Sequence, residues 1–230
     1  MFHVEHFDEQ IIKSVLCDGL DALKININES AIDKLISYFV LLLIKNEFVN
    51  LISPKQDLHT KIIVHLVDSL TPLMWRSLPQ ESIKAMDFGS GGGLPAIPLS
   101  IVRPEWNYTL IESTGKKALF LEEVQSILSL DNVEVYNNFL EPGKNHEKSY
   151  YNLITARGVS DMEKLFSIAG PRLKGDGFFI SFKGPQGERE IKDSVNEMKK
   201  RKMALCDRID FKLPFLEADR SLFIFQRNLI

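Results

Sequence analysis

The sequence lacks any long hydrophobic run, which limits the classes of protein to which it can belong. Its longest apolar segment is Tyr38 to Ile44, far short of the roughly 18 residues that a membrane-spanning helix needs. We therefore expect this segment to form a buried helix face. The N-terminus carries acidic residues and histidines, without the basic start and apolar stretch of a signal peptide. These features predict a protein without membrane contact.

Cysteine and net positive charge are also scarce. Cys17 and Cys206 are the two cysteines, and they lie far apart without the spacing of metal ligands. We expect both to be buried structural thiols, with no metal site, in a reducing, cytoplasmic environment. A net charge of −3 gives no global attraction to nucleic acid. Any contact with RNA would therefore depend on local basic patches.

The order of apolar segments indicates the fold class. Residues 1–82 show helical spacing and predict an N-terminal helical extension packed on the core, with a second domain over 83–230. In that second part short apolar runs alternate with helical patterns, which is typical of a doubly wound α/β sheet with helices on both faces. The expected strands are 83–88, 108–112, 133–136, 151–156, 178–183, 205–212 and 221–226. No helix separates the last two strands, so we expect them to pair antiparallel.

Two local expectations accompany this assignment. Lys174 to Gly177 is interpreted as a turn before the fifth strand, because it contains two glycines and an aspartate. A single helix is expected over 188–202, ending in the basic run Lys199 to Lys202. That run either complements the helix dipole or contacts RNA.

A glycine-rich stretch stands between the first strand and the next helix of the predicted sheet. The apolar run from Ile83 to Phe88 gives way to Gly89, Gly91, Gly92 and Gly93, and an apolar segment resumes at Leu94. Glycine permits positive φ in a tight turn and removes the β-carbon where a ligand approaches the backbone. The N–H groups at the following helix start favour a polar or anionic ligand. The stretch therefore predicts a nucleotide-like ligand.

Two cofactor classes fit this loop. Gly91 to Ala96 satisfies G-x-G-x-x-A, the dinucleotide fingerprint. Asp87 to Gly93 satisfies D-x-G-x-G-x-G, a pattern of S-adenosylmethionine methyltransferases. Both classes place an acid at the end of the second strand, and Glu112 has that spacing. Asp87 would repel a pyrophosphate but suits a ligand that carries an ammonium group, which favours the methyl donor. An NAD(P)-dependent oxidoreductase remains the alternative.

The same residues resemble a known family. Asp87 to Pro104 and Thr109 to Leu121 closely resemble the bacterial ribosomal RNA small-subunit methyltransferase G family, also called glucose-inhibited division protein B. Further similarity lies at Asn50 to Ile52, at His65 to Leu70, and at Thr155 to Val159. The resemblance implies a Rossmann-like class I methyltransferase fold. It also implies a cytoplasmic enzyme that methylates N7 of a guanine in small-subunit ribosomal RNA, with S-adenosylmethionine as the cofactor.

The resemblance and the loop together give the predicted site residues. For the cofactor these are Asp87, Gly89, Ser90, Gly91, Leu94, Glu112, Leu140, Glu141 and Arg157, with Glu112 on the ribose. For the substrate they are Arg157, Lys183 and His65, although His65 and Asp68 could instead pair with each other in a helix. The chain departs from the family pattern at Ala96, Phe139 and Asn152, where Gly, Arg and Asp are usual.

Other methylation chemistries lack their residues. No Pro-Pro pair is present, as methylation of adenine amino groups typically requires, and neither cysteine is placed to act as a nucleophile on a pyrimidine. Guanine N7 has a free lone pair and needs no general base, so positioning would supply most of the rate. We therefore name no catalytic acid or base. The expected partner is ribosomal RNA or a ribosomal particle, bound by a monomer. A non-enzymatic RNA-binding module is a third hypothesis.

Overall fold

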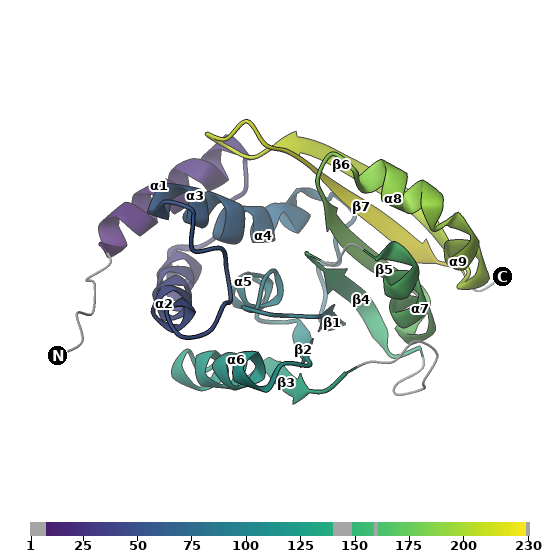
Figure 1. The fold of residues 1–230 in the computed structure, drawn as a ribbon, viewed down its shortest axis with the longest axis horizontal. Helices are drawn as coiled ribbons and strands as arrows, with labels where there is room; N and C mark the ends of the chain where they lie inside the picture. Colours follow the sequence, from purple (N-terminus) through teal and green to yellow (C-terminus); the bar gives the residue numbers. More distant parts are fainter. Residues whose placement is uncertain (1–7, 140–148, 159–160, 229–230) are drawn as a thin grey trace.

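The computed structural model describes residues 8–139, 149–158 and 161–228. Its centre is a seven-stranded sheet with the order β3-β2-β1-β4-β5-β7-β6 (Figure 1). The strands are β1 (Lys84–Phe88), β2 (Asn107–Glu112), β3 (Val133–Asn137), β4 (Tyr151–Ala156), β5 (Leu173–Lys183), β6 (Met203–Lys212) and β7 (Asp219–Arg227). The first five strands are parallel, whereas β7 runs antiparallel to both β5 and β6. The predicted α/β class and the antiparallel pairing of the last two strands are confirmed.

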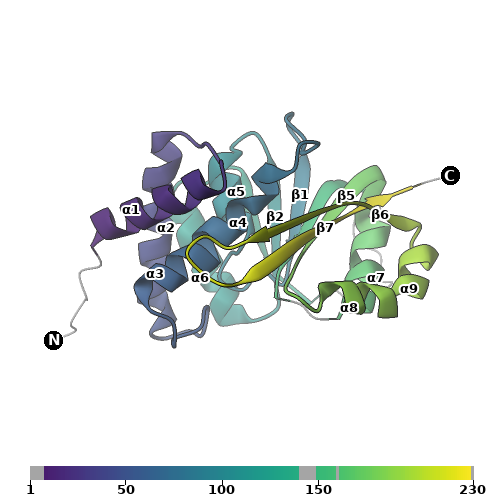
Figure 2. The same cartoon turned by 90° about the horizontal axis from the view of Figure 1, so that it is seen from above.

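Helices cover both faces of this sheet. The N-terminal part comprises α1 (Glu9–Ala22), α2 (Glu29–Asn46), α3 (Leu58–Lys61), a π-helix η1 (Ile62–Val67), α4 (Asp68–Leu70) and a 3₁₀-helix η2 (Thr71–Met74). These lie with α5 (Ala96–Val102) and α6 (Gly115–Ile127) on one face, and α7 (Met162–Arg172), α8 (Gly187–Asp193) and α9 (Val195–Lys200) cover the other (Figures 1 and 2).

The strand sequences explain why two faces are covered. Successive side chains of a strand point to opposite faces. In β1, Ala85 belongs to the core under the N-terminal helices and Met86 to the core under α7. In β7, Ile224 likewise belongs to the core under the N-terminal helices and Phe225 to the core under α7. These two strands are therefore apolar on both sides, as strands between two helix layers require.

The N-terminal helices share a core with the sheet. Asn28 caps α2 through a hydrogen bond from the Ala31 N–H, 2.8 Å long, and the helix then buries Leu35, Phe39 and Leu42. A β-carbon on Gly19 of α1 would lie 2.8 Å from Val67 Cγ2, so the glycine lets α1 approach η1 closely. Side chains from α1, α2 and η1 form one continuous cluster with those of β1 and α5.

Three local expectations are wrong. Lys174 to Gly177 belongs to β5 as a bulge, because Tyr151 pairs with Leu173 and Leu153 then pairs with Phe178. The helix expected over 188–202 is broken at Ser194 into α8 and α9. Neither cysteine is fully buried: Cys17 is half-buried, and Cys206 is exposed because it lies on β6, the edge strand of the sheet.

Within the described residues, no helix has both the length and the apolarity to cross a membrane.

Candidate functional site

The predicted loop lies where the sheet reverses its strand order. The chain leaves β1 for β2 on one side and returns to β4 on the other, so β1 and β4 are neighbours. Ligands of open α/β sheets bind at the carboxyl ends of the strands at such a switch point. The glycine loop follows β1, Glu112 ends β2 and Arg157 follows β4. Segments 70 residues apart in sequence thus meet at one edge.

The glycines of this loop are conformationally required. Gly89, Gly91 and Gly93 have φ values of 70°, 55° and 90°, in the left-handed region that other residues rarely adopt. A β-carbon on Gly93 would lie 2.6 Å from Ile97 Cγ1, inside the core. On Gly91 it would meet only the Gly89 carbonyl oxygen, at 3.8 Å. The loop is therefore packed on one side and open on the other.

Glu112 holds the loop against the end of β2. Its Oε2 accepts a hydrogen bond of 2.8 Å from the Gly91 N–H, and its Oε1 accepts one of 2.7 Å from the Thr114 N–H. A carboxylate oxygen can accept more than one hydrogen bond. Glu112 thus fixes the open side of the loop and keeps acceptor capacity for a ligand.

Asp87 lies beneath the loop and is fully buried. Its Oδ1 accepts a hydrogen bond of 2.6 Å from Thr155 Oγ1 on the neighbouring strand β4. Burial raises the pKa of Asp87 to about 7, although the hydrogen bonds from Thr155 and Ser90 act against this rise. Asp87 consequently joins β1 to β4 and titrates near neutrality.

The N-terminal helices contact the same loop from the other side. Tyr38 Oη of α2 donates a hydrogen bond of 2.6 Å to the Gly92 carbonyl. A β-carbon on Gly92 would lie 3.0 Å from Leu42 Cδ1, so α2 packs directly on the loop backbone. The conformation of the loop therefore depends on residues more than 50 positions earlier.

Arg157 is enclosed by the segment from η1 to α4. Its Nη2 donates a hydrogen bond of 2.6 Å to the Val64 carbonyl, and its Nη1 donates one of 3.0 Å to Ser69 Oγ. Its Nε lies 3.4 Å from Asp68 Oδ2 in an ion pair. The wider turn of a π-helix disturbs the regular ladder of helical hydrogen bonds, which is consistent with a Val64 carbonyl that turns toward a side chain. We call these residues, with His65, the Arg157 cluster.

Two buried atoms of this cluster, His65 Nε2 and Asp68 Oδ1, have no hydrogen-bond partner among the residues that the structure describes. Burial, with Arg157 and Lys61 nearby, lowers the pKa of His65 to about 3, so the ring is neutral at physiological pH. Burial raises the pKa of Asp68, and the charge of Arg157 opposes this rise. Asp68 thus pairs with Arg157, not with His65 as one of the two expectations proposed.

The remaining predicted residues are placed as follows. Lys183, at the end of β5, is buried and its Nζ lies 2.7 Å from Glu190 Oε2 of α8. Leu140 and Glu141 lie outside the described residues. Phe139 is exposed, and Lys164 Nζ lies 5.1 Å from the centre of its ring. Leu94 packs partly buried against the core below the loop.

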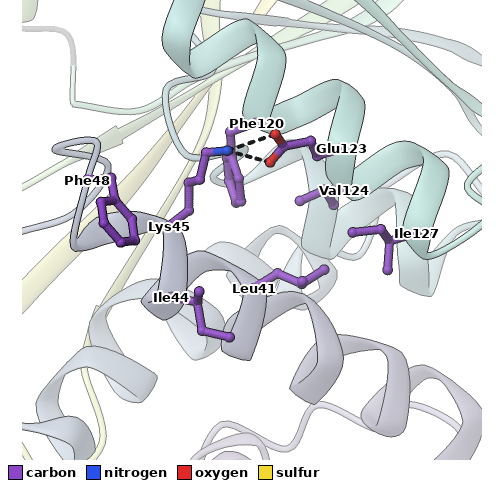
Figure 3. A pocket seen from close by; sticks show the side chains of 8 residues that line it. All are labelled: Leu41, Ile44, Lys45, Phe48, Phe120, Glu123, Val124 and Ile127. Carbon is purple, nitrogen blue, oxygen red and sulfur yellow. Dashed lines mark hydrogen bonds and ion pairs between the residues drawn. The ribbon is translucent and has the colours of Figure 1, made fainter. Parts of the chain in front are cut away.

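A separate hollow of about 290 Å³ lies between α2 and α6, on the helical layer (Figure 3). Its lining is mainly apolar and includes Leu41, Ile44, Phe48 and Ile127. Lys45 Nζ forms an ion pair with Glu123 Oε2 across this hollow, at a distance of 2.6 Å. Among the predicted site residues that the structure describes, none lines it, so this hollow is distinct from the glycine loop.

Comparison with known proteins decides the family. The family model of rRNA small subunit methyltransferase G matches residues 31–222. The chain belongs to this family. The ribosomal RNA small subunit methyltransferase G of Fusobacterium nucleatum is 33% identical over 91% of this chain and 88% of its own length. That of Lysinibacillus sphaericus is 32% identical over 90% and 89%.

Solved structures support the same fold. A geranyl diphosphate C-methyltransferase from Streptomyces coelicolor, in complex with S-adenosyl-L-homocysteine, has a TM-score of 0.56 at 12% identity. The match covers 77% of this chain and 88% of that one. The Rossmann-like methyltransferase fold of methyltransferase G is thus confirmed. The oxidoreductase alternative is not supported, because the matching family and these relatives are methyltransferases.

Sequence analysis missed several contacts of the site. Tyr38 was assigned only to a buried helix face, and Ser69 received no role. The partner of Arg157 was not foreseen, although Asp68 and Ser69 lie within the segment 65–70 that resembles the family. That resemblance was the one signal that could have pointed to them, because periodicity shows only that a residue faces the core.

Proposed function

We propose that this protein transfers a methyl group from S-adenosylmethionine to N7 of a guanine in small-subunit ribosomal RNA. The observation that carries the proposal is the membership of the family, together with a glycine loop that is open on the side facing Glu112. We also infer that it acts as a monomer in the cytoplasm.

The residues at the loop fit this cofactor. The backbone at Gly91 offers a surface without a side chain, and Glu112 can accept hydrogen bonds from ribose hydroxyls while it holds Gly91. Burial raises the pKa of Asp87 beneath the loop, and an ammonium group bound close to it would favour the charged form of this carboxyl. When bound, the cofactor supplies an electrophilic methyl group on a sulfonium.

The role of the protein in this reaction is to position the guanine. N7 has a lone pair at neutral pH, so no proton must leave before it attacks the methyl group. Orientation of two reacting atoms can by itself supply a large part of the rate. We assign Arg157 and His65 to the substrate side of the loop, where the Arg157 cluster borders the end of β4.

The proposal is tested by mapping methylated guanines in small-subunit RNA from cells that lack the gene. We expect one N7-methylguanine to disappear and to return with the wild-type gene. Unchanged RNA would refute the proposal. Calorimetry with S-adenosylhomocysteine and with NAD tests the cofactor separately, and binding of NAD alone would contradict the assignment. Methyl transfer that requires Gly91 would also exclude a purely RNA-binding role.

A further inference from the structure

A groove runs along the C-terminal hairpin of β6 and β7. It encloses about 460 Å³ between Gly184, just after β5, and the facing side chains of the hairpin. Three cations and three carboxylates line it: Arg208, Lys212, Arg220, Glu188, Asp210 and Asp219. Arg220 Nε lies 4.0 Å from Asp68 Oδ2, so this hairpin groove adjoins the Arg157 cluster.

The charges of the hairpin groove balance one another. Arg208 Nε lies 2.8 Å from Asp210 and its Nη1 3.3 Å from Glu188, and Lys212 Nζ lies 4.0 Å from Asp219. A surface with balanced charge does not attract a polyanion over long distances. It does present hydrogen-bond donors and acceptors side by side. The edges of nucleobases also carry donors and acceptors side by side, so the two can pair. The lining therefore suits bases better than phosphates.

An exposed aromatic residue lies in the loop that joins the two strands. Phe215 has 61% of its surface exposed and a φ of 61°. A residue with a β-carbon rarely adopts this left-handed conformation. Leu213 and Pro214 are buried beside it, and the Leu213 N–H donates to the Ala218 carbonyl at 3.0 Å. The loop is thus anchored in a conformation that holds a phenyl ring outward.

The surroundings of Phe215 leave room for a stacking partner. The His59 ring meets it edge-on, with ring centres 5.7 Å apart and planes inclined by 66°, and more than half of the phenylalanine remains exposed. Exposed aromatic rings commonly stack the bases of single-stranded RNA. Lys212, three residues earlier, lines the hairpin groove, so the groove leads toward the ring.

From these observations we propose that the hairpin groove and Phe215 bind unpaired nucleotides next to the target guanine. One base stacks on Phe215, and the groove contacts the edges of the bases between it and the Arg157 cluster. This inference rests on the proposed function and adds a second contact region for the same RNA.

The test measures KM for small-subunit RNA, both naked and assembled with ribosomal proteins. It compares the wild type with two variants of Phe215 and one variant of Ile127. Phe215→Leu keeps an apolar side chain but removes the ring, and Phe215→Trp keeps a ring. Ile127→Ala is the matched control, because Ile127 is also 61% exposed but lies on α6. A lost stack of about 1–3 kcal/mol predicts that Phe215→Leu raises KM for both RNAs by roughly tenfold. Phe215→Trp and Ile127→Ala should match the wild type.

Arg208→Gln tests the groove itself and should also raise KM for both RNAs several-fold. The affinity for S-adenosylhomocysteine, measured by calorimetry, should stay unchanged in all four variants. Either Phe215→Leu or Arg208→Gln with the wild-type KM would overturn the inference. An effect on assembled particles alone would also overturn it, because the hairpin would then contact a ribosomal protein. A wild-type enzyme that fails to methylate either RNA would instead refute the proposed function.

Discussion

The glycine loop and the Arg157 cluster lie at the same edge of the sheet, but they are built in different ways. The loop takes its shape from neighbouring residues: glycines with positive φ, and Glu112 at the end of the adjacent strand. The Arg157 cluster takes its shape from residues 88 to 93 positions earlier in the chain, which form hydrogen bonds with the guanidinium.

This difference shows what the N-terminal helices contribute. Tyr38 binds the loop backbone and Asp68 binds Arg157, so both halves of the site depend on the same helical layer. The helices are therefore part of the site as well as part of the core. Changes in the loop should mainly alter ligand binding, whereas changes in the cluster should mainly alter stability.

The largest expected effect on binding comes from Gly91→Val. The new side chain would project into the open side of the loop, where only the Gly89 carbonyl lies near, so cofactor binding should be abolished while the fold persists. Calorimetry with S-adenosylhomocysteine measures the binding, and circular dichroism checks the fold. Gly93→Ala is the contrasting variant, because its β-carbon would meet Ile97 in the core. It should lower the free energy of unfolding by about 1–3 kcal/mol.

Normal cofactor affinity in Gly91→Val would show that the pocket lies elsewhere.

The largest expected effect on stability comes from Arg157→Ala. Asp68 is buried, and removing the partner of a buried charge costs up to about 3–5 kcal/mol. Arg220, at 4.0 Å, remains as a second and more distant cation beside Asp68. Urea unfolding measures the loss. The double variant with Asp68→Asn should recover a substantial part of it, because no charge then remains unpaired. If the losses in the free energy of unfolding of the two single variants simply add up in the double variant, the ion pair does not hold the cluster together.

The two halves should also respond to pH with opposite signs. The pKa of Asp87 is raised to about 7, so its contribution to stability is complete below pH 4 and is lost as pH rises to 7. The pKa of His65 is lowered to about 3, so its contribution is complete above pH 6.5 and is lost as pH falls toward 3.

Each of these pKa shifts corresponds to a contribution of at most about 4–5 kcal/mol to the free energy of unfolding.

Urea unfolding between pH 4 and 7.5 separates the two contributions. Relative to the wild type, Asp87→Asn should remove the part of the stability that decreases with rising pH. His65→Gln should remove the part that decreases with falling pH. If the free energy of unfolding depends on pH in the same way in the wild type and in Asp87→Asn, Asp87 has an ordinary pKa.

The smallest expected effect belongs to Tyr38→Phe, which removes only the hydroxyl that donates to the Gly92 carbonyl. A buried hydrogen bond of this kind contributes about 1–2 kcal/mol. Thermal unfolding should detect that loss, and calorimetry should show a weaker affinity for S-adenosylhomocysteine. Tyr151→Phe is a control on the aromatic core away from the loop, and it should leave the affinity unchanged. An unchanged affinity in Tyr38→Phe would mean that α2 supports the fold but not the loop.

The same contrast explains how much could be predicted from sequence. Strand periodicity gave the sheet, and the glycine spacing with Glu112 located the loop, because both are local patterns. The partners of Arg157 depend on how distant helices pack, which no local pattern encodes. The bulge at Lys174 to Gly177 is not predictable from sequence for a related reason. A β-carbon on Gly177 would lie too close to the Tyr151 carbonyl of the neighbouring strand. The glycine is therefore required by this contact and not by a turn of the chain.

The break at Ser194 has a local cause that periodicity conceals. Its hydroxyl donates to the Glu190 carbonyl at 2.9 Å, and such contacts of serine with the preceding turn compete with helix continuation. Local sequence therefore predicts elements well, but their ends and their tertiary partners less well.

The central claim is tested most directly by methyl transfer in vitro, with the transferred methyl group then located chemically. Purified protein, labelled S-adenosylmethionine and small-subunit RNA from cells lacking the gene are combined, and the RNA is then treated with borohydride and aniline, which cleave at N7-methylguanine. We predict one new cleavage site with the wild type and none with Gly91→Val. Incorporation of label without cleavage, or no incorporation by the wild type, would contradict the account.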